Sequence, residues 1–177
     1  MIDESYAKWF GLHTNDVLHL VWCSATTTDV LAAYGISPEN TKPMRFQSDD
    51  IDMLIGRLGN GTIIMDYDVD YWSRGCLPAL AQYGPCLSAA WCDDAPAIVS
   101  YYAQGGRVVA FDASFRDWYP DPDLAGVEEW IAATPGGREM WDTRWDRAIL
   151  MTAEALLQAA VDDEWMRSTH IGVTFPE

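Results

Sequence analysis

The sequence has little positive charge. Its 177 residues include 11 lysines and arginines against 27 aspartates and glutamates, and the formal net charge is −16. Nucleic acids and anionic membranes attract basic surfaces, so this imbalance argues against non-specific binding to either of them. It favours solubility, mimicry of a polyanion or a partner that carries positive charge, although a solvated acidic surface has the same composition.

Cysteine and histidine are also scarce. Cys23, Cys76, Cys86 and Cys92 show no C-x-x-C spacing, so we expect small buried side chains in a reducing cytosol. The three histidines stand apart, without an H-E-x-x-H motif or a spacing that indicates a Ser-His-Asp triad. His19 alternates within an apolar strand and is expected to be a satisfied core residue. The sequence predicts no cofactor and no catalytic set.

Long hydrophobic runs are missing as well. No apolar run approaches the roughly 18 residues that cross a bilayer, and the N-terminus opens with the acidic stretch Met-Ile-Asp-Glu-Ser-Tyr instead of a signal peptide. We therefore expect a cytoplasmic protein without membrane association. Hydrophobic residues make up 49% of the chain, which is enough for a full core at this length. With no repeat or linker, residues 1–177 are predicted to form a single α+β domain.

Residues 86–112 give the clearest structural signal. Strands are predicted at Cys86–Cys92, Ala97–Ala103 and Arg107–Asp112. Gly105 and Gly106 separate the last two, and they predict a tight hairpin because both central residues of a primed turn need positive φ. The predicted fold class is α+β, with a mostly antiparallel sheet that has this meander at its core and is covered by helices.

The other elements follow from hydrophobic periods, capping residues and turn residues. Further strands are predicted at 16–23, 53–58, 62–69 and 171–175, the last as an edge strand, and residues 37–47 are predicted to be a loop. Helices are predicted at 3–10, 27–34, 74–83, 124–133 and 138–160, followed by a short helix around Trp165 that Asp162 or Asp163 caps.

Four stretches together resemble an actinobacterial family of unknown function. They are the strand–helix unit Val17–Gly35, the Gly-x-x-x-x-Asp-x-Asp-x-Asp-Tyr-Trp stretch from Gly61, the Tyr-x-x-Gly-Gly-Arg-Val-Val-Ala-Phe-Asp hairpin from Tyr102, and a C-terminal helix pair that ends in Asp-Glu-Trp. The long tryptophan-rich helix at 138–160 departs from the family pattern. Because the family has no assigned activity, the resemblance implies a small acidic α+β domain and leaves its function open.

An acidic run follows the strand predicted at 62–69. If that strand continues, Asp66, Asp68 and Asp70 project from one face, and Trp72 lies just beyond them. Three carboxylates on one face could hold a hard cation or bind a partner, although an EF-hand is excluded because Tyr71 stands where its glycine should be. A solvated strand face is the plainer interpretation. We predict an acidic binding patch and no metal site.

A second acidic segment alternates with aromatic residues. It contains the predicted binding residues Asp117, Trp118, Tyr119, Asp121 and Asp123. Carboxylates beside exposed aromatic rings suit recognition of arginine and lysine on a partner, through ion pairs and cation–π contacts. They would also suit sugar stacking with paired carboxylates as acid and base, or a surface loop whose aromatic rings pack into the core.

Three functions agree with these observations. The first is an acidic protein-binding module, such as an immunity or inhibitor protein that neutralises a basic toxin or nuclease. The second is a carboxylate-based hydrolase that uses Asp66, Asp68, Asp70 or Asp112. The third is a non-catalytic regulatory domain of a cytoplasmic assembly. We favour the first, with a basic protein as the partner and with no binding of nucleic acid or membrane.

Overall fold

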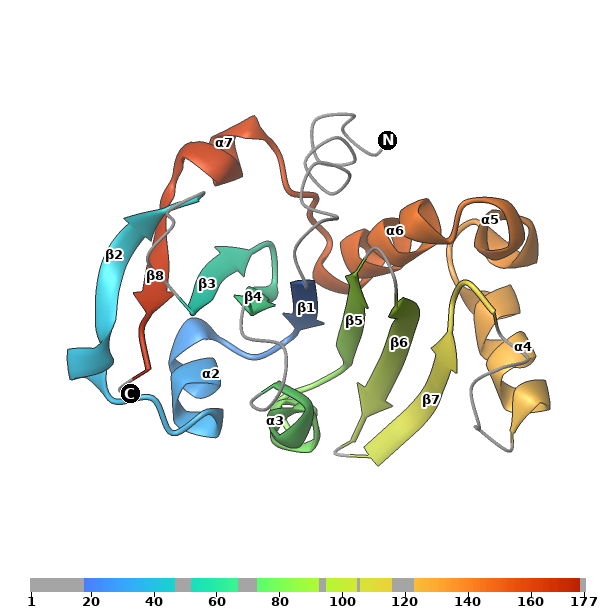
Figure 1. The fold of residues 1–177 in the computed structure, drawn as a ribbon, viewed down its shortest axis with the longest axis horizontal. Coiled ribbons are helices and arrows are strands. Elements are labelled where there is room, and N and C mark those ends of the chain that lie inside the picture. Colours follow the sequence, from blue (N-terminus) through green and yellow to red (C-terminus); the bar gives the residue numbers. More distant parts are fainter. Residues whose placement is uncertain are drawn as a thin grey trace.

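The computed structural model describes residues 18–46, 52–66, 73–92, 95–104, 106–115 and 123–175. Its strands are β1 (Leu18–Cys23), β2 (Thr41–Arg45), β3 (Met53–Leu58), β4 (Gly61–Asp66), β5 (Cys86–Cys92), β6 (Ala95–Ala103), β7 (Gly106–Asp112) and β8 (Thr169–Val173). Within these ranges the strands form one eight-stranded sheet in the order β2-β8-β3-β4-β1-β5-β6-β7. Every neighbouring pair is antiparallel, and Figure 1 shows the strands side by side.

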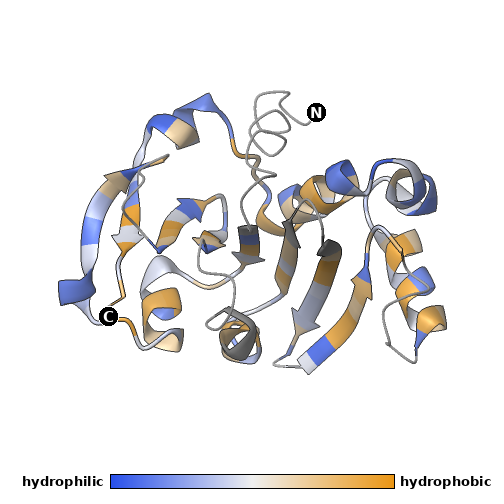
Figure 2. Ribbon diagram, in the orientation of Figure 1, coloured by the Kyte–Doolittle hydropathy of each residue, from blue (hydrophilic) through white to orange (hydrophobic). Residues whose placement is uncertain are grey.

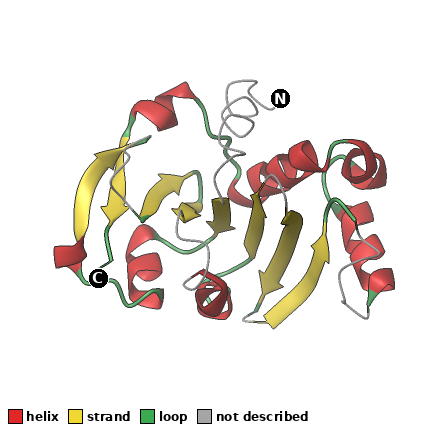
Figure 3. Cartoon of the chain, viewed as in Figure 1, coloured by secondary structure: helices red, strands yellow, loops and turns green. Residues whose placement is uncertain are grey.

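The helices are α2 (Thr27–Ala33), α3 (Ser73–Leu80), α4 (Leu124–Ala133), α5 (Gly137–Thr143), α6 (Trp145–Leu157) and α7 (Asp163–Arg167), with one 3₁₀ turn, η1 (Pro38–Asn40). Figure 3 shows that α2 and α3 lie near the middle of the sheet, whereas α4 and α5 lie at its β7 end and α6 runs back from α5 toward β1. The predicted α+β class with an antiparallel sheet is confirmed. None of the described helices has the length and apolar character that a membrane span requires.

The sheet has a different core on each of its two faces. Leu20 and Trp22 of β1 belong to the cluster that packs under α4, α5 and α6, and we call this side the α6 face. Val21 and Cys23 belong to the cluster that packs under α2 and α3, and we call this side the α3 face. Alternation along each strand produces the two clusters, since successive side chains point to opposite faces. Figure 2 shows the hydrophobic residues along the strands and α6.

The predicted meander forms and builds one end of the sheet as β5, β6 and β7. Its second hairpin reverses one residue earlier than predicted. Ala103 pairs with Gly106, and Gln104 between them takes up the positive φ of 52°. The hairpin of β3 with β4 and the helix at Leu124–Ala133 also form as predicted.

The first strand–helix unit is confirmed with a small change at its cap. Thr26, the residue just before the predicted helix at 27–34, accepts a hydrogen bond from the Asp29 backbone, and the Asp29 side chain accepts one from the Thr26 backbone. This reciprocal capping box fixes where α2 begins. Gly35 follows the helix with a φ of +64°, which agrees with its predicted role at the helix end.

Two predictions at the β2 end of the sheet are wrong, for a shared reason. The region predicted to be a loop contains β2, which pairs with β8. The strand predicted at the edge is β8, and it lies inside the sheet between β2 and β3. The shared reason is that β2 is the true edge strand. An edge strand needs no apolar alternation and tolerates a proline such as Pro43, so the sequence of β2 resembles a loop. Because β2 was not recognised, β8 was placed at the edge.

The long helix predicted at 138–160 is wrong, because two helices meet at Arg144. This residue ends α5 and begins α6 with non-helical dihedral angles (φ −149°, ψ 59°). Its guanidinium holds the Asp146 carboxylate through two hydrogen bonds, of 3.2 and 2.9 Å. The apolar stripe continues through both helices, so the hydrophobic period does not reveal the break.

The remaining predicted elements are shorter or lie elsewhere. The helix predicted at 74–83 ends at Leu80, and it contains Pro78 beyond its first turn. The short helix α7 has Asp162 as its cap, as predicted. The helix predicted at 3–10 and the continuation of β4 beyond Asp66 lie outside the described residues.

Candidate functional site

Buried polar side chains gather on the α3 face of the sheet. Five strand residues there are less than 5% exposed, and they are His19, Thr62, Asp66, Ser88 and Asp112. The register places Asp66, His19 and Asp112 in one row across the sheet. His19 lies opposite Asp66 of β4 on one side and Ala90 of β5 on the other. Ile98 of β6 lies opposite both Ala90 and Asp112 of β7, which completes the row.

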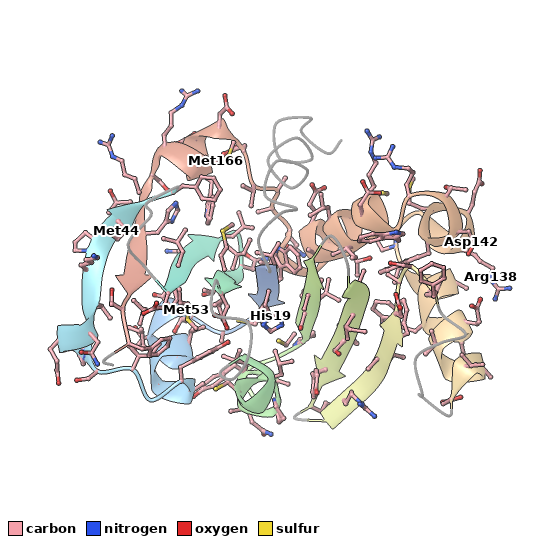
Figure 4. All side chains as sticks on the ribbon, in the orientation of Figure 1. His19, Met44, Met53, Arg138, Asp142 and Met166 are labelled. Atoms are coloured by element: carbon pink, nitrogen blue, oxygen red, sulfur yellow. The ribbon has the colours of Figure 1, made fainter. Side chains whose placement is uncertain are left out.

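His19 and Ser88 form the best-defined contact of this row. The His19 Nε2 atom lies 2.7 Å from the Ser88 Oγ atom, so a hydrogen bond joins β1 to β5. Figure 4 labels His19 on β1, in the middle of the sheet. The predicted role of His19 as a satisfied core residue is confirmed. Because Ser88 is 4% exposed and lies within a strand, this pair ties two strands together and does not present its hydroxyl at the surface.

Asp66 is the one member of the first predicted patch whose position the structure describes. Its side chain is 1% exposed, so the interpretation of a solvated strand face is wrong for this residue. Asp66 lies directly opposite His19, and side chains in such a pair have Cβ atoms about 4.5–5.5 Å apart. Asp68, Asp70 and Trp72 lie outside the described residues.

The cysteines on this face behave as apolar side chains. Cys23 and Cys86 lie directly opposite each other on β1 and β5, and both are fully buried. Burial raises the pKa of Cys23 to about 12 and also raises the pKa of Cys86 well above its usual value of 9.0. Burial, and then the charge of Asp66, raises the pKa of the half-buried Cys76. Thiols in this state are poor nucleophiles and metal ligands, which agrees with their predicted role.

Two aspartates hold the ends of the second predicted segment. The Asp112 Oδ1 atom accepts hydrogen bonds from the backbone of Ser114 (2.8 Å) and Phe115 (3.2 Å), after β7. Asp123 is the cap of α4 and accepts a 2.9 Å hydrogen bond from the Gly126 backbone. Both residues therefore fix backbone geometry. Between them, the predicted residues Asp117, Trp118, Tyr119 and Asp121 lie outside the described residues.

Exposed apolar side chains stand on both sides of that segment. Phe115 is 60% exposed and Leu124 is 45% exposed, and Glu129 of α4 is exposed as well. We call Phe115, Asp123, Leu124 and Glu129, with the segment 116–122 that connects them, the β7–α4 end. The neighbouring Glu128 pairs with Arg138 at 3.1 Å, so its charge is already compensated.

The described tryptophans pack helices onto the sheet. Trp130, Trp141, Tyr101 and Phe111 form an aromatic cluster under α4 and α5, with ring centroids 5.3 to 5.9 Å apart. Trp130 is half-buried in this cluster, so its ring supports the helix more than it serves a partner. Trp165 packs on the sheet in the same way and donates a 2.8 Å hydrogen bond to the Arg57 carbonyl.

The contact of His19 with Ser88 was not predicted from the sequence. A polar residue in an apolar strand was the available signal, and both residues show it. Across the described ranges, no group of three or more His, Cys, Asp or Glu side chains could hold a metal ion. No family model, curated protein or solved structure matches the chain, so the family resemblance stays a prediction.

Proposed function

We propose that this protein is an acidic binding module that recognises a basic protein through the β7–α4 end. The observation that carries the proposal is the exposure of Phe115 and Leu124 on either side of a segment that contains three aspartates, Trp118 and Tyr119. Groups of exposed apolar side chains that are rimmed by polar residues are typical of protein interaction sites.

The chemistry of this end suits a partner rich in arginine and lysine. Aromatic rings and carboxylates recognise guanidinium and ammonium groups through cation–π contacts and ion pairs. The net charge of −16 would also attract such a partner over long range and speed association at low ionic strength. A basic toxin or nuclease has the required charge, and neutralising one is the role we propose for the module.

The hydrolase alternative finds less support among the described carboxylates. Asp112 uses its Oδ1 atom to hold the turn after β7, and Asp66 is buried opposite His19. Neither carboxylate is placed to meet a substrate at the surface. The regulatory-domain alternative stays a prediction.

The test compares two variants with the same change in charge. The first, Asp117→Lys with Asp121→Lys and Asp123→Ser, changes the β7–α4 end and keeps a capping side chain on α4. The second, Glu39→Lys with Glu164→Lys and Asp163→Ser, changes η1 and α7 at the other end of the sheet. A basic partner would be isolated with the wild-type protein at low salt, and its association rate would be measured with all three proteins.

We expect the first variant to associate about tenfold more slowly or worse, with a weaker dependence on salt. The second variant should keep most of the wild-type rate, because only long-range attraction is reduced. Equal slowing in both variants would show that charge alone acts and that the β7–α4 end is not the interface. Adding Phe115→Ala should raise the dissociation rate if the exposed ring is an anchor.

A further inference from the structure

A groove lies at the opposite end of the sheet, on the α3 face. It consists of two adjoining hollows of about 410 and 430 Å³, and Thr27 of α2 and Arg57 of β3 line both of them. Each hollow falls in the range of sites that bind small molecules. The groove therefore has the size of a ligand site and is separate from the β7–α4 end.

The floor of the first hollow is an apolar row across three strands. Pro43 of β2 lies opposite Ile171 of β8, and Ile171 lies opposite Ile55 of β3. The rim is polar and includes Thr27, Thr169 and Arg57. One side of the groove can thus receive an apolar group while hydroxyl and guanidinium groups stand beside it.

The charge of the groove is opposite to that of the chain. Arg57 contributes positive charge, and among the described residues no carboxylate lines either hollow, although the chain has 27 aspartates and glutamates. The nearest acidic residue on α2, Asp29, is turned back to the Thr26 hydroxyl and backbone.

Arg57, like Arg45 and Arg147, makes no ion pair with a described carboxylate, whereas three other described arginines do. Arg138, Arg144 and Arg167 each pair with a carboxylate at 2.9 to 3.1 Å. The Arg57 side chain is exposed and makes no ion pair with any residue in the described ranges. In so acidic a chain, an arginine without a carboxylate that lines two hollows is available to an external anion.

We propose that this groove binds a small organic carboxylate with an apolar body. The carboxylate pairs with the Arg57 guanidinium, whose planar fork matches two carboxylate oxygens. The apolar body lies on Ile171 and Pro43, where its surface leaves water. A single guanidinium beside an apolar floor suits one carboxylate better than a phosphate, which has more oxygens to satisfy.

The proposal can be tested with simple probes followed by amide NMR shifts. Hexanoate is the ligand probe, hexanamide has the same shape without the charge, and inorganic phosphate has charge without the apolar body. We expect saturable shifts with hexanoate at α2, β3 and β8, and about tenfold weaker binding of the other two probes. Equal binding of hexanamide or of phosphate, or no saturable shift with hexanoate, would overturn the proposal.

Substitutions of single arginines test whether hexanoate binds at Arg57. Arg57→Gln should weaken hexanoate binding about ten- to hundredfold, which is the effect of losing a charge-assisted pair. Arg138→Gln, with the same loss of charge on α5, should bind as the wild type does. Because Arg57 is exposed, both variants should keep the wild-type spectrum without ligand. Undiminished binding by Arg57→Gln, or an equal loss in Arg138→Gln, would contradict the assignment.

Discussion

The two faces of the sheet use the same strands for different chemistry. On the α6 face, His170 is the one polar residue among the buried strand residues that the structure describes, and aromatic rings fill the space under the helices. On the α3 face, five buried polar strand residues lie among aliphatic and cysteine side chains. The α6 face is therefore packed by aromatic and aliphatic side chains, whereas the α3 face combines an aliphatic core with buried polar groups that need hydrogen-bond partners.

The difference has a physical origin in how each face is covered. Dense aromatic packing needs large complementary surfaces, which α4, α5 and α6 supply together. Polar groups can be buried under the shorter helices α2 and α3 only when each finds a partner, as His19 does with Ser88. The following substitutions test this contrast.

The largest effect is expected for Trp141→Ala on the α6 face. Trp141 is 2% exposed, contacts the rings of Phe111 and Trp130, and donates a 2.7 Å hydrogen bond to Thr134. Removing a ring of this size should lower the free energy of unfolding by about 3–5 kcal/mol, as measured by urea denaturation. Trp141→Phe should lose less, and a loss for the alanine variant below about 1 kcal/mol would refute the assignment of the packing core.

An intermediate effect is expected for Ser88→Ala on the α3 face. The change removes the partner of a buried His19 nitrogen, which should lower the free energy of unfolding by about 1–3 kcal/mol. Ser100→Ala is the control, since Ser100 lies opposite Ser88 on β6 and is half-buried. A double-mutant cycle with His19→Ala should give a clear coupling energy, and additive losses would show that the contact contributes nothing.

The smallest effect on stability is expected for a substitution of His170, the buried polar strand residue described on the α6 face. Its ring stacks on Trp165 at 4.1 Å, and its Nε2 atom donates to the Trp165 carbonyl at 2.9 Å. Burial lowers the pKa of His170 below its usual 6.5, and the hydrogen bond to Trp165 opposes this only partly. The unfolded chain therefore binds a proton more readily than the folded protein does.

Stability should accordingly fall as the pH drops below about 6.5, until the folded-state pKa of His170 is passed. His170→Gln removes this contribution, so its free energy of unfolding should change less between about pH 7 and pH 5 than that of the wild type. Denaturation curves at several pH values would measure the difference. Equal pH dependence in the two proteins would show that proton binding by His170 is not linked to folding.

Local signals predicted much of the fold correctly. Turn residues and β-branched runs located β3, β4 and the meander, and a capping residue with a terminal glycine located α2. The errors fall where local signals and tertiary context differ. Strand β2 has Pro43 and no apolar alternation, and its pairing with β8 alone makes it a strand. The break at Arg144 leaves the hydrophobic stripe of α5 and α6 intact, so no period could show it.

The sequence predicted which kinds of residue belong to the candidate sites, but it did not predict which of those residues contact one another. The acidic and aromatic character of residues 117–123 is visible in the sequence, as is the isolation of His19. The contact of His19 with Ser88 spans 69 residues, and the groove at Arg57 draws on three strands and a helix. Such arrangements depend on strand order, which hydrophobic alternation does not encode.

The sequence by itself determined the charge of this protein, its α+β class and most of its individual strands and helices, because these follow from composition and short-range backbone preferences. The tertiary structure alone decided that β8 lies inside the sheet, that Asp66 is buried opposite His19, and that Arg57 lies in a groove whose described lining has no carboxylate. These features arise when segments far apart in the chain pair through backbone hydrogen bonds, and pairing of that kind is fixed by the whole fold.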